Sequence, residues 1–132
     1  MKTNLDKFFK TNKQLEQEGV DFTIDDKTSF KVRRFNDQNP RVKAAMAQYY
    51  KPYERMIQMG TLGVEQQNEI TIKLFIDCSL VSWKGIEDSD GKPIEFSKEN
   101  ALALFKSLPD LFSTLWKYAN EMDSYLEQVG KP

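Results

Sequence analysis

The sequence predicts a mainly α fold, a compact helical bundle of about five helices with a short β-hairpin near the N-terminus. Apolar side chains recur every three or four residues over four long segments, which is the period of an amphipathic helix. Strict alternation of apolar and polar residues, the period of a strand, is confined to one N-terminal segment. The chain has 132 residues, of which 39% are hydrophobic, so we expect a single domain over residues 1–132.

The first helix is expected over residues 4–18. Leu5, Phe8 and Leu15 lie at helical spacing and form a rough apolar stripe. The stripe ends at Gly19, a residue suited to the left-handed conformation that follows many helices.

A β-hairpin is expected over residues 20–35. Residues 20–24 and 30–35 alternate between apolar and polar side chains, as half-buried strands do. The segment Asp25-Asp26-Lys27-Thr28 between them supplies turn-forming residues.

A kinked helix is expected over residues 40–59. Asn39 can cap its start, and Pro40 fits the first helical position because no backbone donor is needed there. Pro52 removes a backbone hydrogen bond and should kink the helix near its third turn, and Gly60 should end it.

The central helix is expected over residues 64–84. Ile70, Leu74 and Cys78 keep one face apolar, and the neighbouring Phe75 and Ile76 widen that face, which predicts burial on more than one side. We interpret the single cysteine as a small buried hydrophobic residue. An ordered loop or a very small hairpin should follow, because an Asp-Gly turn lies between short extended pieces.

Two further helices are expected over residues 98–108 and 110–129. Ser97 can cap the first, and Asp110 lies where the second needs a cap. The apolar stripe of the last helix should run to Gly130.

The chain lacks residues that catalytic and metal-binding sites commonly require. Histidine is absent, which removes the commonest general base and the commonest transition-metal ligand, so we expect no enzyme, no cofactor and no metal site. The run Asp88-Ser89-Asp90-Gly91 resembles part of a calcium loop. However, Ile86 and Ser97 then occupy the positions of the first and last carboxylate ligands, so a turn is the better interpretation.

The charges nearly balance, with 19 basic and 20 acidic residues, which makes nucleic acid a poor candidate for the main partner. A basic cluster near the hairpin exit keeps one alternative open, a small helical regulator that binds nucleic acid. Its members are Lys31, Arg33, Arg34, Arg41 and Lys43. We see no signal peptide and no apolar run long enough to span a membrane, so a cytosolic location is expected.

The segment 46–59 is the strongest candidate for a protein-binding surface, because Met and Tyr there outnumber the Leu and Val of an ordinary core. Thioethers adapt to irregular apolar partners, and tyrosines offer rigid amphipathic contact area. A core position in the bundle is the simpler interpretation for the stripe residues, and Tyr50 and Met59, which lie off that stripe, are the better contact candidates. The stripe residues are Met46, Tyr49, Tyr53, Met56 and Ile57. The predicted protein-binding residues are Met46, Tyr49, Tyr50, Tyr53, Met56, Met59 and Leu62.

The stretch 80–101 carries a resemblance to a known family. Its features are a helix that ends at Trp83, the loop Asp88-Ser89-Asp90-Gly91-Lys92-Pro93-Ile94, and a helix capped by Ser97 that leads to Leu108-Pro109-Asp110-Leu111. With the N-terminal hairpin and the Asn-Pro helix start, the chain resembles, over residues 20–129, the tail assembly chaperones of siphophages, in particular lactococcal ones.

The resemblance implies a non-enzymatic chaperone that binds and solubilises the phage tape measure protein during tail assembly. It implies a mainly α fold and a homo-oligomer, with the tail tube protein as a further candidate partner and no membrane association. It also implies a location in the host cell cytoplasm and absence from the mature virion. The family has no catalytic residues to carry over.

Overall fold

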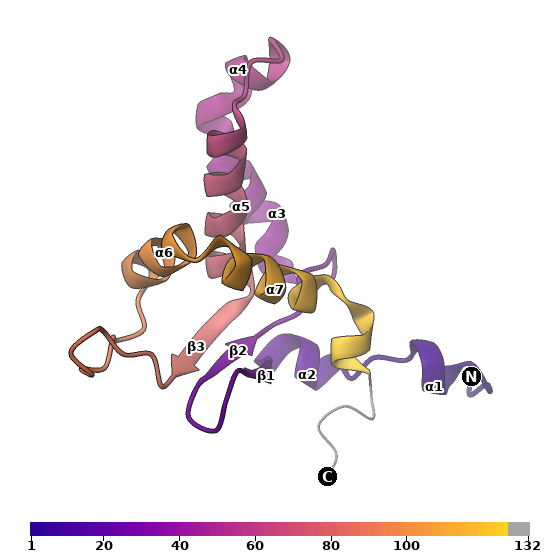
Figure 1. Cartoon of the computed structure of the whole chain (residues 1–132). Coiled ribbons are helices and arrows are strands. Elements are labelled where there is room, and N and C mark those ends of the chain that lie inside the picture. The colour runs from indigo at the N-terminus through magenta and orange to yellow at the C-terminus, as the bar shows by residue number, and fades with distance from the viewer. Residues whose placement is uncertain (127–132) are drawn as a thin grey trace.

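The computed structural model describes residues 1–126 (Figure 1). Its helices are α1 (Asp6–Phe9), α2 (Lys13–Glu18), α3 (Pro40–Tyr50), α4 (Glu54–Gln58), α5 (Val64–Cys78), α6 (Lys98–Ser107) and α7 (Pro109–Asn120). Its strands are β1 (Val20–Thr23), β2 (Ser29–Val32) and β3 (Leu80–Lys84), and short 3-10 helices occur at η1 (Lys51–Tyr53) and η2 (Met122–Tyr125).

The predicted helical bundle is wrong, because the fold is mixed and contains a three-stranded antiparallel sheet in the order β1-β2-β3. The predicted hairpin is confirmed as β1 and β2, in which Phe22 pairs with Phe30. The third strand comes from the segment that we expected to be the end of the central helix. That helix, predicted over 64–84, ends at Cys78, and β3 then pairs with β2.

Tertiary packing explains why residues 80–84 form a strand. Trp83 is the register partner of Phe30, and the two rings meet edge to face with centroids 6.2 Å apart. The Trp83 indole Nε1 donates a hydrogen bond to the Ile94 carbonyl at 2.9 Å. Val81 follows Cys78 by three residues, so the helical period continues by coincidence into the strand. Residues 80–84 therefore form a strand because of their cross-strand partners in β2, which lie far away in the sequence.

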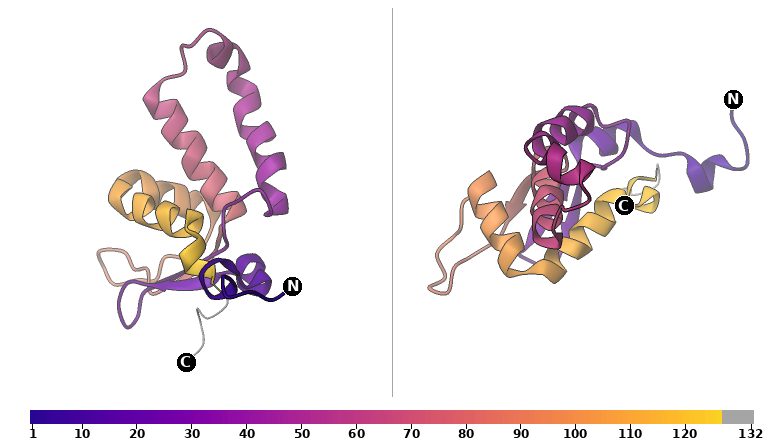
Figure 2. Two further views of the ribbon diagram at one scale, coloured as in Figure 1. Left: turned by 90° about the vertical axis from the view of Figure 1, so that its right-hand side faces the viewer. Right: turned by 90° about the horizontal axis from the view of Figure 1, so that it is seen from above.

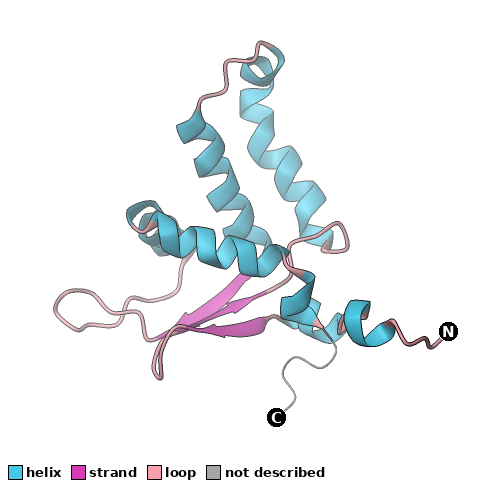
Figure 3. Cartoon of the chain, turned by 45° about the vertical axis from the view of Figure 1, so that its right-hand side comes forward, coloured by secondary structure: helices cyan, strands magenta, loops and turns pink. Residues whose placement is uncertain are grey.

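The sheet has one covered face and one open face. Helices α6 and α7 and the last turns of α5 cover one side, and Figure 3 shows none of the described helices beneath the other. Phe30 and Val32 on the covered face are buried, whereas polar residues such as Lys31 alternate with them in β2. This is the alternation expected of an antiparallel sheet with one solvated face.

The body of the molecule, which we define as the sheet with α6 and α7, is built around an aromatic core. The Phe75 ring of α5 lies within 5.7 Å of Phe105, 5.6 Å of Phe112 and 6.4 Å of Trp116, measured between ring centroids. Tyr125 is fully buried, and its hydroxyl donates to the Val32 carbonyl at 2.9 Å. These contacts join α5, α6, α7 and η2 to the sheet.

The predicted helices at both ends of the described chain are shorter than expected, because residues near the two ends pair with each other. The predicted helix over 4–18 is interrupted, because Thr11 forms a β-bridge with Leu126 and Asn12 then caps a new helix, α2. The predicted helix over 110–129 ends at Asn120, and the chain turns through η2 so that Tyr125 enters the core. The predicted end near 129 lies outside the described residues.

Candidate protein-binding surface

Helices α3 and α5 form an antiparallel pair that projects from the body, with α4 at its far end (Figures 1 and 2). We call this unit, residues 40–78, the arm. Helices α3 and α5 pack through a cluster of mostly small side chains, with Phe35 and several tyrosines at its edges. The buried members are Val42, Ala45, Ile70, Leu74 and Cys78.

The root of the arm is fixed by one buried polar side chain, Asn39. Its Oδ1 accepts a hydrogen bond from the Arg41 backbone N–H at 3.0 Å, which confirms the predicted cap. Its Nδ2 donates to the Arg34 carbonyl at 3.0 Å and to the Cys78 carbonyl at 2.9 Å. One side chain therefore joins the start of α3 to the end of α5 and to the segment that follows β2.

The tip of the arm, residues 54–64, is shaped by local sequence. The predicted kink at Pro52 is confirmed, since the helix passes through the 3-10 turn η1 before α4. Gly60 then reverses the chain with a φ of +70°, a conformation that glycine adopts without a steric penalty. The Gln66 side chain accepts a hydrogen bond from the Gly63 N–H at 2.7 Å and so starts α5.

This chain reversal leaves apolar side chains exposed to solvent at the tip. Ile57 is 43% exposed, Met59 67% and Val64 76%. They come from α4, from the turn and from the first residue of α5, so one end of the arm carries all three. Single exposed apolar residues are ordinary on protein surfaces, but a group on a projecting element is typical of an interaction site.

The predicted protein-binding residues divide into two groups in the structure. Met46 and Met59 are exposed. The other five are partly buried within the arm, and Tyr50, one of the better contact candidates from the sequence, accepts a hydrogen bond from the Gln67 Nε2 at 2.8 Å. Those packed against the α3–α5 cluster are Tyr49, Tyr50, Tyr53 and Leu62, and Met56 is half-buried near the tip.

Sequence reasoning missed Val64 and placed Ile57 on the core stripe. Ile57 follows the helical period, so periodicity alone assigned it to a buried face, and Val64 was expected only as the start of the central helix. The available signal was their place at the far end of a helical hairpin, where no further element remains to cover the apolar stripe.

Tyr49 anchors a polar contact where the arm meets α6. Its hydroxyl donates a hydrogen bond to the Asp77 carboxylate, which also receives the Lys98 ammonium at 2.9 Å. Burial, followed by the hydrogen bond and the negative charge of Asp77, raises the pKa of Tyr49 to about 12. The phenol therefore stays protonated near neutral pH and serves as a structural donor.

The basic cluster proposed from the sequence is partly engaged within the chain. The Arg33 Nε donates to the Gln17 carbonyl at 2.7 Å, and Arg34 forms an ion pair with Glu16 at 2.8 Å in a partly buried setting. Lys31 lies on the open face of the sheet, and Arg41 and Lys43 are exposed on α3. The structure therefore divides the five cations between different faces and internal contacts.

The remaining chemical candidates have structural roles. Cys78 is fully buried, and this burial raises the pKa of its thiol to about 11. Asp88 accepts hydrogen bonds from the backbone N–H groups of Asp90 and Lys92, so the run at 88–91 is a turn. Within residues 1–126, no group of three or more potential metal ligands is arranged around one point, and no helix is long and apolar enough to cross a membrane.

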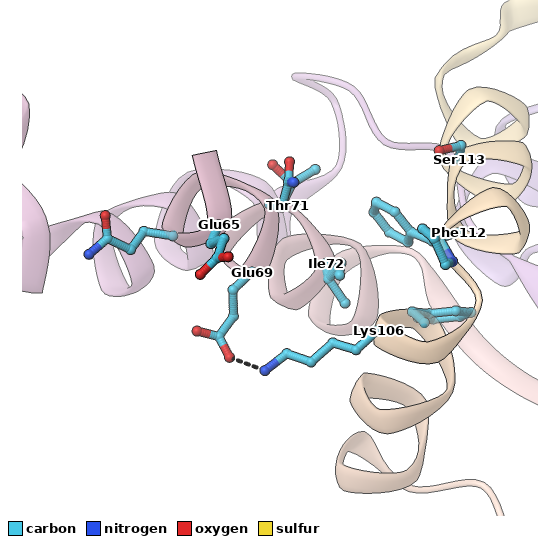
Figure 4. A pocket seen from close by; sticks show the side chains of 11 residues that line it. Glu65, Glu69, Thr71, Ile72, Lys106, Phe112 and Ser113 are labelled. Atoms are coloured by element: carbon cyan, nitrogen blue, oxygen red, sulfur yellow. Dashed lines mark hydrogen bonds and ion pairs between the residues drawn. The ribbon is translucent and has the colours of Figure 1, made fainter. Parts of the chain in front are cut away.

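A groove of about 680 Å³ lies between α5 and the α6–α7 corner (Figure 4). Its lining is mixed: polar and charged side chains of α5 and α6 surround Phe112, and the neighbouring Ile72 and Phe105 are buried. The ion pair between Lys106 and Glu69, at 2.6 Å, crosses from α6 to α5. Its volume is in the range of pockets that take ligands, roughly 300–1,000 Å³.

Comparison with known proteins adds the origin of the chain. A family model described as YdaY prophage protein matches residues 37–131, which span the arm, β3, α6 and α7. The chain belongs to the YdaY prophage protein family. It is thus a protein of phage origin, and the matched region begins just before α3, after the N-terminal helices and the hairpin. No curated protein and no solved structure matches the chain.

Proposed function

We propose that this prophage protein is a non-enzymatic tail assembly chaperone that binds the phage tape measure protein and keeps it soluble in the host cytoplasm. The observation that carries the proposal is the exposed apolar tip of the arm, with Ile57, Met59 and Val64 held away from the body. A tape measure protein is a very long, helical, apolar chain in the family that this sequence resembles. Its apolar faces need cover until the tail tube forms around it.

The physical basis of the binding is adaptable apolar contact. Met59 and Ile57 are unlike in shape and lie on a short helix and a turn, so the tip can fit against irregular apolar stripes. The tip of the arm lies away from the main core, so it can carry such side chains without exposing the core itself. The phage origin of the family agrees with this role.

The test is co-expression with the tape measure protein encoded in the same prophage. We expect the wild-type chain to move that protein into the soluble fraction, as judged by gel analysis after centrifugation. The double variant Met59→Asp with Val64→Asp should lose most of this effect, because charged side chains at the tip oppose apolar burial. Tyr50 is a poorer test position than the sequence indicated, since it packs against α5.

The matched control is Ile24→Asp, which places the same charge at an exposed apolar residue in the β1–β2 turn. This variant should retain the solubilising effect. Full solubilisation by a folded tip variant would refute the tip as the contact surface. Strong, salt-dependent binding of the wild-type chain to duplex DNA, with no effect on the tape measure protein, would overturn the proposal in favour of nucleic acid.

A further inference from the structure

The N-terminal segment, residues 1–10, presents an apolar face that the described part of the chain leaves uncovered. Leu5 and Phe8 are each 53% exposed and Phe9 is 64% exposed. They are three and four residues apart, so the single turn of α1 places them on one side. The Phe8 and Phe9 rings meet edge to face with centroids 6.4 Å apart. No residue of α1 is buried, so these side chains do not serve the core.

The segment is held to the body at its end and projects from there. Thr11 pairs with Leu126 in a β-bridge, and the Asn12 N–H donates to the Tyr125 carbonyl at 2.8 Å. From this fixed point the chain leads outward, and Figures 1 and 2 show α1 beyond the sheet and the other helices. The segment therefore extends farther on this side than the rest of the described chain, so a broad surface can contact it.

Positive charge accompanies the apolar residues. Residues 1–10 contain three lysines and one carboxylate, although the chain as a whole has a net charge of −1. That carboxylate, Asp6, accepts hydrogen bonds from the Thr3 hydroxyl and backbone N–H, and so stabilises the start of α1. Lys7 lies over the Phe8 ring with its Nζ 5.0 Å from the centroid, so charge and apolar surface are presented together.

We propose that residues 1–10 bind the surface of an anionic lipid bilayer. Phenylalanine and leucine side chains enter the boundary between head groups and acyl chains, while lysines remain at the level of the phosphates and attract anionic lipids. Charge complementarity favours this partner for the segment and not for the tip of the arm, which is also apolar and exposed, because Glu54 there balances Arg55.

The contact is weak and reversible, because three apolar side chains provide less burial than a lipid anchor does and the lysines must supply the remaining attraction. A surface contact of this kind requires no helix that crosses the bilayer. It is an addition to the family resemblance, which implies no membrane association. The contact uses neither Met59 nor Val64, so it does not rest on the tip surface or on the function proposed above.

The first test is co-sedimentation of the full-length protein with lipid vesicles. We expect binding to vesicles of equal parts phosphatidylcholine and phosphatidylglycerol at about 1 mM lipid, and no binding to vesicles of phosphatidylcholine alone. Binding should fall as the salt concentration rises, because screening weakens the attraction between lysines and anionic lipids.

The apolar contribution is tested by the variant Phe8→Asp with Phe9→Asp, which should abolish vesicle binding because carboxylates oppose burial among lipids. Its helical content by circular dichroism should stay unchanged, since α1 has no buried residue. The matched control is Ile24→Asp with Met59→Asp, which adds the same two charges at exposed apolar residues outside the segment. This control should keep most of its vesicle binding.

The charge contribution is tested by Lys2→Gln with Lys7→Gln. Partitioning into the anionic vesicles should weaken by about fivefold for each lysine removed. The matched control is Lys43→Gln with Lys84→Gln, which removes two exposed cations outside the segment. Its partitioning should stay within about twofold of the wild type.

The position of the contact is tested with an environment-sensitive fluorophore on an introduced cysteine. Cys78 is fully buried, so the label attaches to Leu5→Cys or, in the control, to Ile24→Cys. Anionic vesicles should shift the emission of the label at position 5 to shorter wavelength and leave that at position 24 unchanged.

Three results would overturn the inference. They are wild-type protein that does not bind anionic vesicles, undiminished binding by the Phe8 and Phe9 variant, and a label at position 5 that does not respond to vesicles. Equal binding to neutral and anionic vesicles would contradict the charge complementarity on which it depends. Loss of tape measure solubilisation with unchanged vesicle binding would count against the tip surface only, so the two proposals fail separately.

Discussion

The body and the arm bury different kinds of side chain. In the body the largest of the fully buried side chains are aromatic, as Phe30, Phe105 and Tyr125 illustrate. In the arm the buried cluster consists of smaller residues such as Val42 and Ala45, and its tyrosines remain at the edge, where the hydroxyl groups of Tyr49 and Tyr50 bond to polar partners. Burial of apolar area contributes stability roughly in proportion to that area, so the body should hold most of the free energy of folding.

The contrast shows how one chain combines a stable core with exposed apolar residues. Helix α5 serves both regions, because Phe75 and Ile76 face the body while Ile70 and Leu74 face α3. Its first turn extends beyond the body, and Val64 there is exposed. The predicted burial of this helix on more than one side is confirmed, and its consequence is that the arm is rigidly tied to the body.

The largest expected effect is at the aromatic centre of the body. Phe75→Ala removes a fully buried ring that contacts Phe105, Phe112 and Trp116, and we expect a loss of about 3–5 kcal/mol in the free energy of unfolding. Urea denaturation followed by tryptophan fluorescence measures it. Phe8→Ala, at an exposed ring, is the control and should change stability little. A loss below about 1 kcal/mol at Phe75 would show that the body is not the dominant core.

The next effect concerns the joint between the two regions. Asn39→Ala removes a helix cap worth about 1 kcal/mol and leaves the Arg34 and Cys78 carbonyls without their donor, so we expect a loss of about 2–3 kcal/mol. Asn39→Ser should recover the cap but not the two donated hydrogen bonds. Its free energy of unfolding should therefore lie between those of the wild type and Asn39→Ala. Equal stability of the Ser and Ala variants in urea denaturation would mean that the side chain contributes nothing through its cap.

Much of the local structure follows from the sequence, and the misassigned parts depend on distant contacts. The Asn39 cap, the Pro52 kink and the β1–β2 hairpin each rest on neighbouring residues, and all three are confirmed. The third strand was missed because β3 is determined by its register with β2, some fifty residues earlier in the chain. Short apolar runs are ambiguous between helix and strand until such partners are known.

The candidate site was only partly predictable for the same reason. The sequence placed Met59 off the core stripe, and Met59 is exposed; it placed Met46 on that stripe, yet Met46 is exposed as well. It gave no indication that Tyr50 would bond to Gln67 across the arm, or that the N-terminal Phe8 and Phe9 would lie outside the body. Both outcomes depend on the arrangement of elements and not on local spacing.

A smaller effect is expected where α6 contacts the arm. Asp77→Asn removes the charged acceptor of the Tyr49 hydroxyl, and we expect a loss of about 1 kcal/mol together with a lower pKa for Tyr49. The folded state holds this phenol proton up to about pH 12, whereas the unfolded state releases it near the ordinary tyrosine pKa of 10.0. The stabilisation is therefore complete below pH 10 and is lost as the pH rises toward 12.

Phenolate absorbance during an alkaline titration measures this pKa, and Tyr49→Phe identifies its step among the other tyrosines. Lys98→Ala tests the exposed ion partner of Asp77 and should cost no more than about 0.5 kcal/mol. An unchanged Tyr49 titration in Asp77→Asn would show that burial alone raises the pKa.

The smallest effect on stability should come from the tip of the arm, and this is the sharpest test of the contrast between the regions. Met59→Asp with Val64→Asp changes two side chains that are mostly in water, so we expect the free energy of unfolding to stay within about 0.5 kcal/mol of the wild type. Asp at position 64 also lies at the positive end of α5, which favours the charge. Side chains that are free to bind a partner contribute little to the free energy of unfolding of the isolated chain. A clear loss of stability in urea denaturation would therefore mean that the tip belongs to the folded core of the arm.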